Sequence, residues 1–320
     1  ARLLSNEGYQ VWGTTRQKEP SMTNLVKLGI DQNINVIKLD LCDKVSIDET
    51  IDRLKPEHVY NLAAPSSVVK SFEKPFDVLQ SVVIGTENLL DAVRTISPET
   101  RFYQASSSEM FGNAGAIFQN EKTQLCPQSP YAVAKACAHS LIGIYRKQYG
   151  IFAVSGILFN HESPLRPATY VSQKITRFLT RHHAGQPGIL NLGNLDVSRD
   201  FGFSGDYVRA MYSMLTHPVP DDFVVATGKS RTIRNFAEVT MEFLGIRYEW
   251  VGTGLKELCL SSDTGRPIIK VDPQLYRPLE VIETCGDASK AQEQLGWMPK
   301  VSFQELVALM VETERTSLSC

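Results

Sequence analysis

A tyrosine and a lysine four residues apart carry the clearest chemical signal in this sequence. Tyr131 and Lys135 follow Ser129 and Pro130, a typical helix start, so a helix should place both side chains on one face. A phenol beside an ammonium has a lowered pKa, which allows it to act as a base near neutral pH. The pair therefore predicts a general base at Tyr131.

Hydroxyls and one carboxylate come shortly before this pair. Residues 106–109 read Ser-Ser-Ser-Glu and follow the segment 101–105, which has the composition of a strand. Folds with parallel sheets bind ligands at the carboxyl edge, where these polar groups would then lie. Serines and a lone glutamate after a strand are also ordinary turn residues, so the prediction of a reaction site rests on their combination with Tyr131 and Lys135.

Alternating strands and helices are expected to position these groups. Strands are predicted at 9–14, 35–39, 58–62, 101–105, 152–157 and 222–226, and helices at 45–54, 78–96, 131–149, 171–183, 205–215, 233–244 and 303–314. This order predicts the α/β class, with a doubly wound, parallel, Rossmann-type sheet and a smaller C-terminal substrate-binding lobe. The stretch 252–278 is expected to be mostly loop.

The expected division falls near residue 160. Residues 1–160 should form a nucleotide-binding domain and 161–320 mainly the substrate lobe, with about 196–228 returning to the main sheet. A sheet of this type begins with a strand and a glycine-rich turn, and neither is visible before the strand at 9–14. Because a parallel sheet without its first, central strand leaves two rows of backbone groups unpaired, we expect both upstream of Ala1.

Strand ends in the first half indicate where a dinucleotide would lie. The strand at 9–14 leads into Arg16, which suits the 2′-phosphate of NADP, whereas NAD enzymes usually carry an acid there. Asp40 and Leu41 end the next strand, where a carboxylate can accept a hydrogen bond from an adenine amino group. Leu62, Ala63 and Ala64 close another strand, and the two small alanines would let the backbone approach a cofactor. NADP is therefore expected, with NAD as the alternative.

Composition excludes several classes of protein. The net charge of −2 over 320 residues does not favour nucleic-acid binding. Six scattered cysteines form no Cys-x-x-Cys pair, and no histidine or acidic group has zinc-ligand spacing, so we expect a reducing compartment and no metal. No apolar run reaches the roughly 18–20 residues that span a bilayer. We expect a cytoplasmic protein that binds neither membrane nor nucleic acid.

Longer segments resemble a known family. Ser-x-Glu after a strand, followed about twenty residues later by Tyr-x-x-x-Lys, resembles the extended short-chain dehydrogenase/reductase superfamily. The segment 156–164, Gly-Ile-Leu-Phe-Asn-His-Glu-Ser-Pro, is similar to the GDP-mannose 4,6-dehydratase family in particular, as are 105–112, 206–208 and 277–281. Together these segments extend the resemblance over nearly the whole chain. It implies a hydro-lyase that retains NADP, acts on a GDP-sugar and forms a homodimer or homotetramer.

The resemblance also implies roles for individual residues. Ser107, where the family usually has Thr, would bind the sugar 4-oxygen, Glu109 would be the acid/base carboxylate, and Tyr131 and Lys135 would be the base and its activating lysine. Tyr131, Lys135 and His161 would contact the cofactor. The residues implied to hold the GDP-sugar are Ser66, Asn160, Arg166, Val171, Lys174, Asn194, Arg199, Arg277 and Glu280.

The implied reaction is an internal oxidation and reduction. Tyr131 takes the proton of the 4-hydroxyl while hydride leaves C4, which gives a 4-keto sugar. The ketone acidifies the C5 hydrogen, so Glu109 can remove it and protonate the departing 6-hydroxyl. Return of the hydride to C6 gives GDP-4-keto-6-deoxymannose from GDP-mannose and regenerates the cofactor.

Several departures from the family pattern keep alternatives open. Gln173 stands where the family usually has Arg, residues 167–170 read Pro-Ala-Thr-Tyr in place of a Gly-x-x-Phe-like segment, and Arg16 is followed by Gln where relatives often have a second arginine. The substrate could be a related GDP-sugar such as a GDP-manno-heptose. A 4-keto reductase or epimerase needs no carboxylate like Glu109, and an inactive NADP or sugar-nucleotide binder has no need of all four catalytic residue types.

Overall fold

A computed structural model describes residues 1–65, 67–115, 118–276 and 280–319. A parallel four-stranded sheet lies at its centre, in the order β3 (His58–Asn61), β4 (Arg101–Ser107), β5 (Ala153–Leu158) and β9 (Asp222–Val225). Nearly every residue of β4 and β5 is buried, because helices cover both faces, and such strands read as continuous apolar runs. The parallel sheet confirms the predicted fold class.

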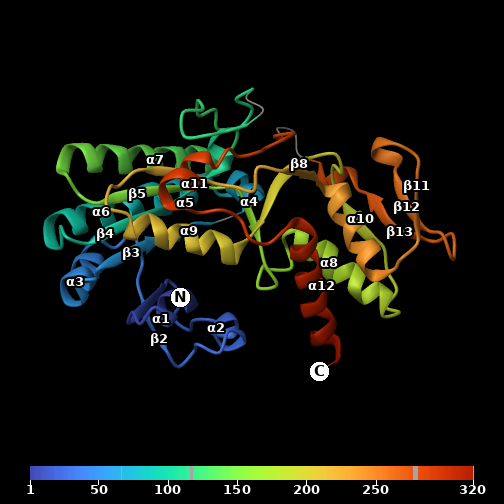
Figure 1. Ribbon diagram of the computed structural model, residues 1–320, viewed down its shortest axis with the longest axis horizontal. Helices are drawn as coiled ribbons and strands as arrows, with labels where there is room; N and C mark the ends of the chain where they lie inside the picture. The colour runs from blue at the N-terminus through green and yellow to red at the C-terminus, as the bar shows by residue number, and fades with distance from the viewer. Residues whose placement is uncertain (66, 116–117, 277–279, 320) are drawn as a thin grey trace.

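Helices pack on both faces of this sheet, and α7 and α9 lie on opposite sides of it (Figure 1). The main helices are α3 (Lys44–Leu54), α6 (Gly85–Ile96) and α7 (Pro130–Tyr149) on one face and α9 (Ser204–Thr216) and α11 (Ser289–Leu295) on the other. Each face of the sheet has its own hydrophobic core, and successive residues of β4 point into different ones. Phe102 belongs to the core with Leu90 and Ile142, whereas Tyr103 belongs to the core with Tyr207.

A glycine in β5 lets the strands and the Tyr103 side chain fit together. A Cβ at Gly156 would overlap the Tyr103 hydroxyl, and Tyr103 is itself fully buried. The tyrosine ring therefore occupies the space that a side chain at position 156 would need.

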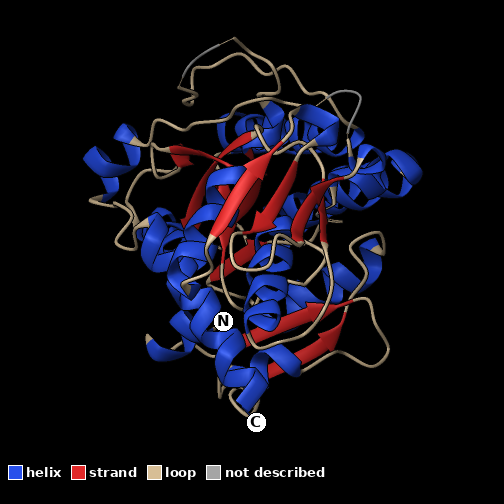
Figure 2. Ribbon diagram, turned by 90° about the vertical axis from the view of Figure 1, so that its right-hand side faces the viewer, coloured by secondary structure: helices blue, strands red, loops and turns tan. Residues whose placement is uncertain are grey.

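The strands β1 (Val11–Thr15) and β2 (Ile34–Lys38) form a second parallel sheet beside α1 (Arg2–Asn6) and α2 (Thr23–Lys27). Figures 1 and 2 show this pair at the foot of the molecule, below the larger sheets. β1 and β3 are edge strands of two separate parallel sheets, the arrangement expected for a doubly wound sheet whose first, central strand is not among the described residues. Ladder pairing within the described residues thus stops at these two edges.

The C-terminal half adds two further sheets around its own core. One has the order β10 (Ser230–Thr232), β8 (Ser198–Phe203), β6 (Asn160–Glu162), and the other β11 (Tyr248–Val251), β12 (Leu258–Ser261), β13 (Pro267–Val271), β7 (Leu190–Leu192). The helices α8 (Val171–His183), α10 (Ile233–Leu244) and α12 (Phe303–Ser319) pack beside them, with Leu179, Phe236 and Met310 fully buried. None of the described helices combines the length and the apolar character needed to cross a bilayer.

Two stretches of the chain differ in detail from the expectation. The stretch 252–278 holds the antiparallel pair β12 and β13 rather than mostly loop, because these short strands are stabilised by pairing with each other and with β7 and β11. The single helix expected at 78–96 is α5 (Pro75–Leu79), a π-helical turn η1 (Gln80–Ile84) and α6. The interruption sits where Gly85 packs against Leu41, since a Cβ there would lie 2.8 Å from that of Leu41.

Candidate active site

The helix α7 begins where the sequence predicts and carries both Tyr131 and Lys135. Ser129 caps it by accepting a hydrogen bond of 3.1 Å from the Ala132 N–H, Pro130 occupies the first turn, and Gly150 ends the helix in the left-handed region. Tyr131 and Lys135 lie one turn apart, with Nζ 5.8 Å from the centre of the Tyr131 ring. The spacing thus brings the two groups together as expected.

Lys135 is a buried ammonium at the base of the site. Its side chain is only 3% exposed, and Nζ donates a hydrogen bond of 2.7 Å to the Ala105 carbonyl of β4. Burial disfavours the charged form and lowers the pKa of Lys135 to about 8. Among the described residues, this carbonyl is the hydrogen-bond acceptor of Nζ, so two of its three N–H groups remain for a ligand.

The pKa of Tyr131 differs from the expectation. Burial raises the pKa of this phenol to about 12, whereas proximity to Lys135 was expected to lower it. The hydrogen bond from Ser107 and the nearby charge of Arg166 act in the lowering direction, while Glu109 adds to the rise. Loss of water around the phenol therefore outweighs the effect of the nearby charges on its pKa.

Ser107 and Glu109 lie where β4 ends. The Ser107 hydroxyl accepts a hydrogen bond of 3.3 Å from the Glu109 N–H, which opens the short helix η2 (Ser108–Met110). This capping turn aims the serine at Tyr131 and leaves Glu109 on the wall of a cavity of about 440 Å³. A base, a hydroxyl and a carboxylate therefore meet at the carboxyl edge of the sheet.

The cavity joins both halves of the chain. Of the predicted residues it is lined by Glu109, Arg199 and Glu280; its other lining residues are Val68, Val69, Phe72, Glu73, Gln128, Ser129, Tyr276 and Val281. Arg199 is 8% exposed, and its guanidinium donates to the carbonyls of Ser198 and Val281, both at 2.8 Å. A buried cation thus lines the same cavity as Glu109.

Arg166 lies in a second cavity, of about 350 Å³, which Gln173 also lines. Its guanidinium stacks on Tyr170 at 3.8 Å, and Nε lies 3.2 Å from Oε2 of the buried Glu162. Glu162 also accepts a hydrogen bond of 2.6 Å from the Ser172 hydroxyl. Arg166 lies close enough to Tyr131 for its charge to lower the pKa of the phenol.

Other predicted substrate residues are engaged within the protein. Lys174 donates 2.7 Å to the Asn191 carbonyl, and Asn194 Oδ1 accepts 3.0 Å from the Asp196 N–H. Val171 starts α8 and Asn160 starts β6, both partly buried. Within the described ranges, these four do not line the first cavity with Glu109.

The predicted cofactor residues Arg16, Asp40 and Leu41 lie at one strand edge. Asp40 Oδ1 accepts a hydrogen bond of 3.0 Å from the Cys42 N–H, and Arg16 is close enough to lower the pKa of the Cys42 thiol against the larger effect of burial. Asn88 of α6 donates 2.8 Å to the Leu41 carbonyl. The loop after β2 is thus fixed by α6, while the exposed Arg16 faces it.

Leu62, Ala63 and Ala64 follow β3. The Ala63 N–H donates 3.3 Å to Asn61 Oδ1, and Asn61 Nδ2 in turn donates 2.8 Å to Gln104 Oε1 of β4. Leu62 is 55% exposed, which leaves this backbone open to an approaching ligand.

His161 is held by its own chain. Its Nδ1 lies 2.8 Å from the Phe159 carbonyl, and its ring stacks on Tyr207 with the centres 5.0 Å apart. Burial lowers the pKa of His161 to about 4, so the ring is neutral and Nδ1–H donates to the carbonyl. Nε2 is then an acceptor.

Comparison with known proteins decides the family. Residues 1–310 match the GDP-mannose 4,6 dehydratase family. The chain belongs to this family. It is 40% identical over 326 residues to the GDP-mannose 4,6-dehydratase of Sinorhizobium fredii, which covers 99% of this chain and 93% of the relative.

Solved structures of lower identity share the fold of this GDP-mannose 4,6-dehydratase family member. The Thermus thermophilus UDP-glucose 4-epimerase, in complex with NAD, has a TM-score of 0.80 at 24% identity and covers 98% of this chain and 94% of its own. RMD from Pseudomonas aeruginosa, in complex with NADPH, has a TM-score of 0.76 at 22% identity and covers 96% and 100%.

Sequence reasoning missed several cavity residues of this family member. Val68, Val69, Phe72 and Glu73 lie on α4 (Val68–Glu73), and Phe72 is 54% exposed. Apolar residues at this spacing also occur on ordinary core helices, so no signal in the sequence separates the two cases. Two predicted substrate residues, Ser66 and Arg277, lie outside the described residues. The described part of the chain holds no cluster of three or more metal-ligating side chains.

Proposed function

We propose that this protein converts GDP-mannose to GDP-4-keto-6-deoxymannose, a 4,6-dehydration. The observation that supports it best is the position of Glu109 on a cavity wall shared with Arg199, beside Ser107 and Tyr131. A simple 4-epimerase needs a base and a hydroxyl but no such carboxylate. Membership of the GDP-mannose 4,6 dehydratase family supports the same reaction.

We propose NADP as the resident cofactor, bound mainly by residues 1–160, with 161–320 binding the sugar nucleotide. The buried Lys135 fits a nicotinamide ribose, because its two remaining N–H groups can donate to hydroxyls. Arg16 at the loop after β1 fits a 2′-phosphate, which favours NADP over NAD. When bound, the oxidised nicotinamide would supply a hydride acceptor.

Tyr131 acts as the base on the sugar 4-hydroxyl. The charge of Lys135 stabilises the phenolate, and the Ser107 hydroxyl, which already bonds the phenol, orients the 4-oxygen. This pairing offsets the high pKa that burial alone gives Tyr131. Removal of the hydroxyl proton accompanies loss of hydride from C4 and leaves a ketone.

Glu109 completes the elimination. The 4-ketone acidifies the C5 hydrogen, Glu109 takes that proton, and the same carboxylic acid then protonates the 6-hydroxyl as it leaves as water. One carboxylate suffices for the proton balance, because the proton that Glu109 takes from C5 is the one that it gives to the 6-oxygen. The hydride lost from C4 would return to C6, and Tyr131 would give C5 the proton taken from the 4-hydroxyl, which yields the 6-deoxy product.

The GDP moiety is proposed to bind across the C-terminal half. Arg199 is suited to the diphosphate, because a planar guanidinium matches two phosphate oxygens. The further proposed sugar-nucleotide residues are Ser66, Asn160, Arg166, Val171, Lys174, Asn194, Arg277 and Glu280. A homodimer or homotetramer is proposed from the family alone.

Mass spectrometry of GDP-mannose incubated with the NADP-loaded protein tests this function. A product about 18 mass units lighter is expected, and Glu109→Gln should lower its rate by at least about 10²-fold. Glu99→Gln, at an exposed glutamate before β4, is the matched control and should keep the wild-type rate. Unchanged GDP-mannose with folded, loaded protein would overturn the assignment; the assay would then move to a GDP-manno-heptose, since Gln173 departs from the family pattern.

A further inference from the structure

Three residues of α7, spaced four apart, contact three consecutive residues of β4. The contacts are Tyr131 with the Ser107 hydroxyl, Lys135 Nζ with the Ala105 carbonyl at 2.7 Å, and His139 Nδ1 with the Ser106 hydroxyl at 3.3 Å. The first two belong to the reaction centre. The third has no part in the mechanism above and lies one turn further along the same helix face.

The Ser106 side chain faces α7 and contacts it at His139. Alternate residues of a strand face opposite sides of the sheet, and Ser106 shares its side with Phe102, which packs against Ile142 of α7. Ser106 is 4% exposed and is not among the residues that line either described cavity. Ser106, His139 and Asp222 have the residue types of a hydrolytic triad, but this serine is closed to any substrate.

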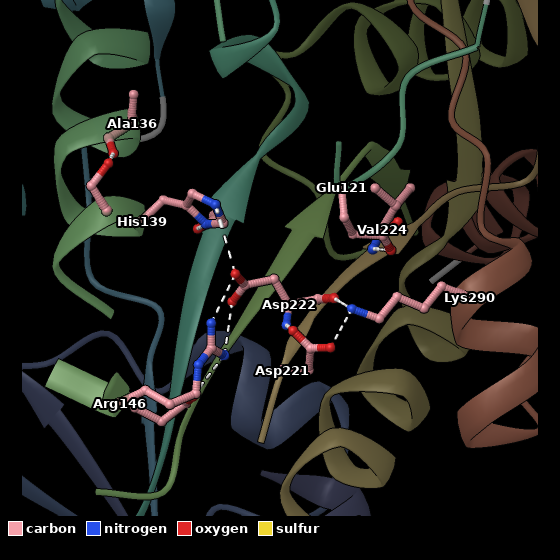
Figure 3. A network of polar contacts seen from close by, with 11 residues as sticks. Glu121, Ala136, His139, Arg146, Asp221, Asp222, Val224 and Lys290 are labelled. Atoms are coloured by element: carbon pink, nitrogen blue, oxygen red, sulfur yellow. Dashed lines mark hydrogen bonds and ion pairs between the residues drawn. The ribbon is translucent and has the colours of Figure 1, made fainter. Parts of the chain in front are cut away.

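A salt bridge stands behind the histidine. His139 Nε2 lies 4.0 Å from Oδ2 of Asp222 at the start of β9, and Arg146 holds that carboxylate with two hydrogen bonds of 3.1 and 3.0 Å (Figure 3). Lys290 of α11 lies beyond, bound to Asp221 at 2.5 Å and to the Asp222 carbonyl at 2.8 Å. These groups fix the environment of the imidazole from β4, β9, α7 and α11.

The imidazole is neutral in this setting. Burial is the largest effect and lowers the pKa of His139; the charge of Arg146 acts in the same direction and that of Asp222 opposes it. A neutral ring with Nε2–H toward the carboxylate leaves Nδ1 as an acceptor, so the Ser106 hydroxyl donates to it. Protonation would turn Nδ1 into a donor and break this arrangement.

We propose that His139 is a positioning residue for this active site: through Ser106 it sets the register of α7 against β4 and thereby the placement of Tyr131 and Lys135. The inference rests on the proposed function in that these two residues do the chemistry. Because a displacement of about 1 Å at reacting groups can cost about 10²-fold in rate, one hydrogen bond a turn away from Lys135 is well placed to control turnover.

Matched variants separate the hydrogen bond from the volume of the side chain. His139→Leu removes the acceptor, whereas His139→Asn places an amide oxygen at the same number of bonds from the backbone as Nδ1. We expect kcat to fall about tenfold in His139→Leu with KM within about twofold, and His139→Asn to recover kcat to within about threefold of wild type. Ser140→Ala, on the exposed side of the same helix, is the control and should not change kcat.

Two further measurements do not depend on turnover. NADPH titration by fluorescence should show affinity weakened severalfold in His139→Leu and restored in His139→Asn. The proton NMR signal of the His139 ring, assigned by its loss in His139→Asn, should titrate below the ordinary histidine range and move upward in Ser106→Ala, where the hydroxyl no longer favours the neutral ring.

Equal losses of kcat and NADPH affinity in the leucine and asparagine variants would overturn the proposal, as would a folded His139→Leu with wild-type kcat. The Ser106→Ala, His139→Leu double variant gives a further test. If its fold-loss in kcat equals the product of the fold-losses of the two single variants, the two residues act independently and the proposal is overturned. If wild type leaves GDP-mannose unchanged while the NADPH and NMR results follow the pattern above, the proposed function fails and the role of His139 stands.

Discussion

At the scale of single residues, burial controls the acid-base groups of the site more strongly than their nearest charges do. Lys135 has its pKa lowered to about 8 and Tyr131 has its pKa raised to about 12, and burial is the first cause in both cases. Each shift favours the neutral form: the phenol of Tyr131 is protonated near neutral pH, and the ammonium of Lys135 loses its proton more readily than an ordinary lysine does.

Replacement of Lys135 by methionine should separate stability from activity. We expect turnover to fall at least about 10²-fold, because the phenolate loses its cation. Lys135 has a pKa of about 8 in the folded protein and the ordinary value of 10.5 in the unfolded chain. Between these two pH values the unfolded chain binds more protons than the folded protein, so the free energy of unfolding rises with pH.

Denaturant titrations at pH 7.5 and 9.5 measure this effect. The rise in the free energy of unfolding between the two pH values should be smaller in Lys135→Met than in wild type by about 1–2 kcal/mol. Lys147→Met, at an exposed lysine of the same helix, should keep the wild-type difference. An equal pH dependence in Lys135→Met and wild type would contradict the lowered pKa.

At the scale of elements, one buried carboxylate joins three segments. Asp200 of β8 accepts hydrogen bonds from the N–H groups of Thr227, Gly228 and Gly286, at 2.8, 2.9 and 3.3 Å, and one of 2.6 Å from the Thr227 hydroxyl. The neighbouring Arg199 lines the cavity and donates to Val281. Asp200 thus fixes the turn after β9 and the segment that leads from the cavity to α11.

Asp200→Asn should destabilise the fold strongly. The amide nitrogen of asparagine cannot accept, so the N–H groups on one side of the carboxylate would face another donor. We expect a loss of about 2–4 kcal/mol in the free energy of unfolding, measured by urea titration. Asp196→Asn, at an exposed aspartate before β8, should change stability by less than about 1 kcal/mol. Equal stability of Asp200→Asn and wild type would show that these bonds contribute little.

Local signals explain which elements and site residues could be predicted. The ends of α7 are marked by Ser129, Pro130 and Gly150, and the carboxyl edge of the sheet is marked by the strand end at Ser107. These signals are enough to predict that Tyr131 lies at this edge. The π-helical turn η1 was missed because the apolar spacing of residues 78–96 does not distinguish a π-helical turn from an α-helical one, and the close contact of the next residue, Gly85, with Leu41 exists only in the folded chain. Phe72 and Tyr276 were missed because their exposure toward a cavity exists only after the halves have packed.

At the scale of the whole molecule, the two parallel sheets differ in how deeply they are buried. Phe102 of β4 and Val154 of β5 are fully buried, whereas the small cluster under β1 and β2 consists of Val11, Ile30 and Ile34, each 5–9% exposed. Fewer buried apolar contacts leave a segment nearer to local unfolding. The β1–β2 unit is accordingly the less protected part of the N-terminal half.

Hydrogen exchange followed by mass spectrometry should show this order. Amides of β4 and β5 should exchange slowest, and those of residues 11–38 at least about tenfold faster. Addition of NADPH should slow exchange most around Arg16 and Asp40, because the proposed cofactor residues at that edge would become ordered. Protection by NADPH confined to the C-terminal half would contradict the proposed cofactor site.

The pairing of Gly156 with Tyr103 constrains how this sequence can change over evolutionary time. Because the tyrosine ring fills the space beside the glycine, a substitution to alanine at 156 meets a clash unless residue 103 has become smaller first. A change of Tyr103 to a smaller residue while Gly156 is kept leaves a void but creates no overlap. Mutational paths through this pair therefore run in one direction, and a lineage that keeps Tyr103 keeps Gly156 with it.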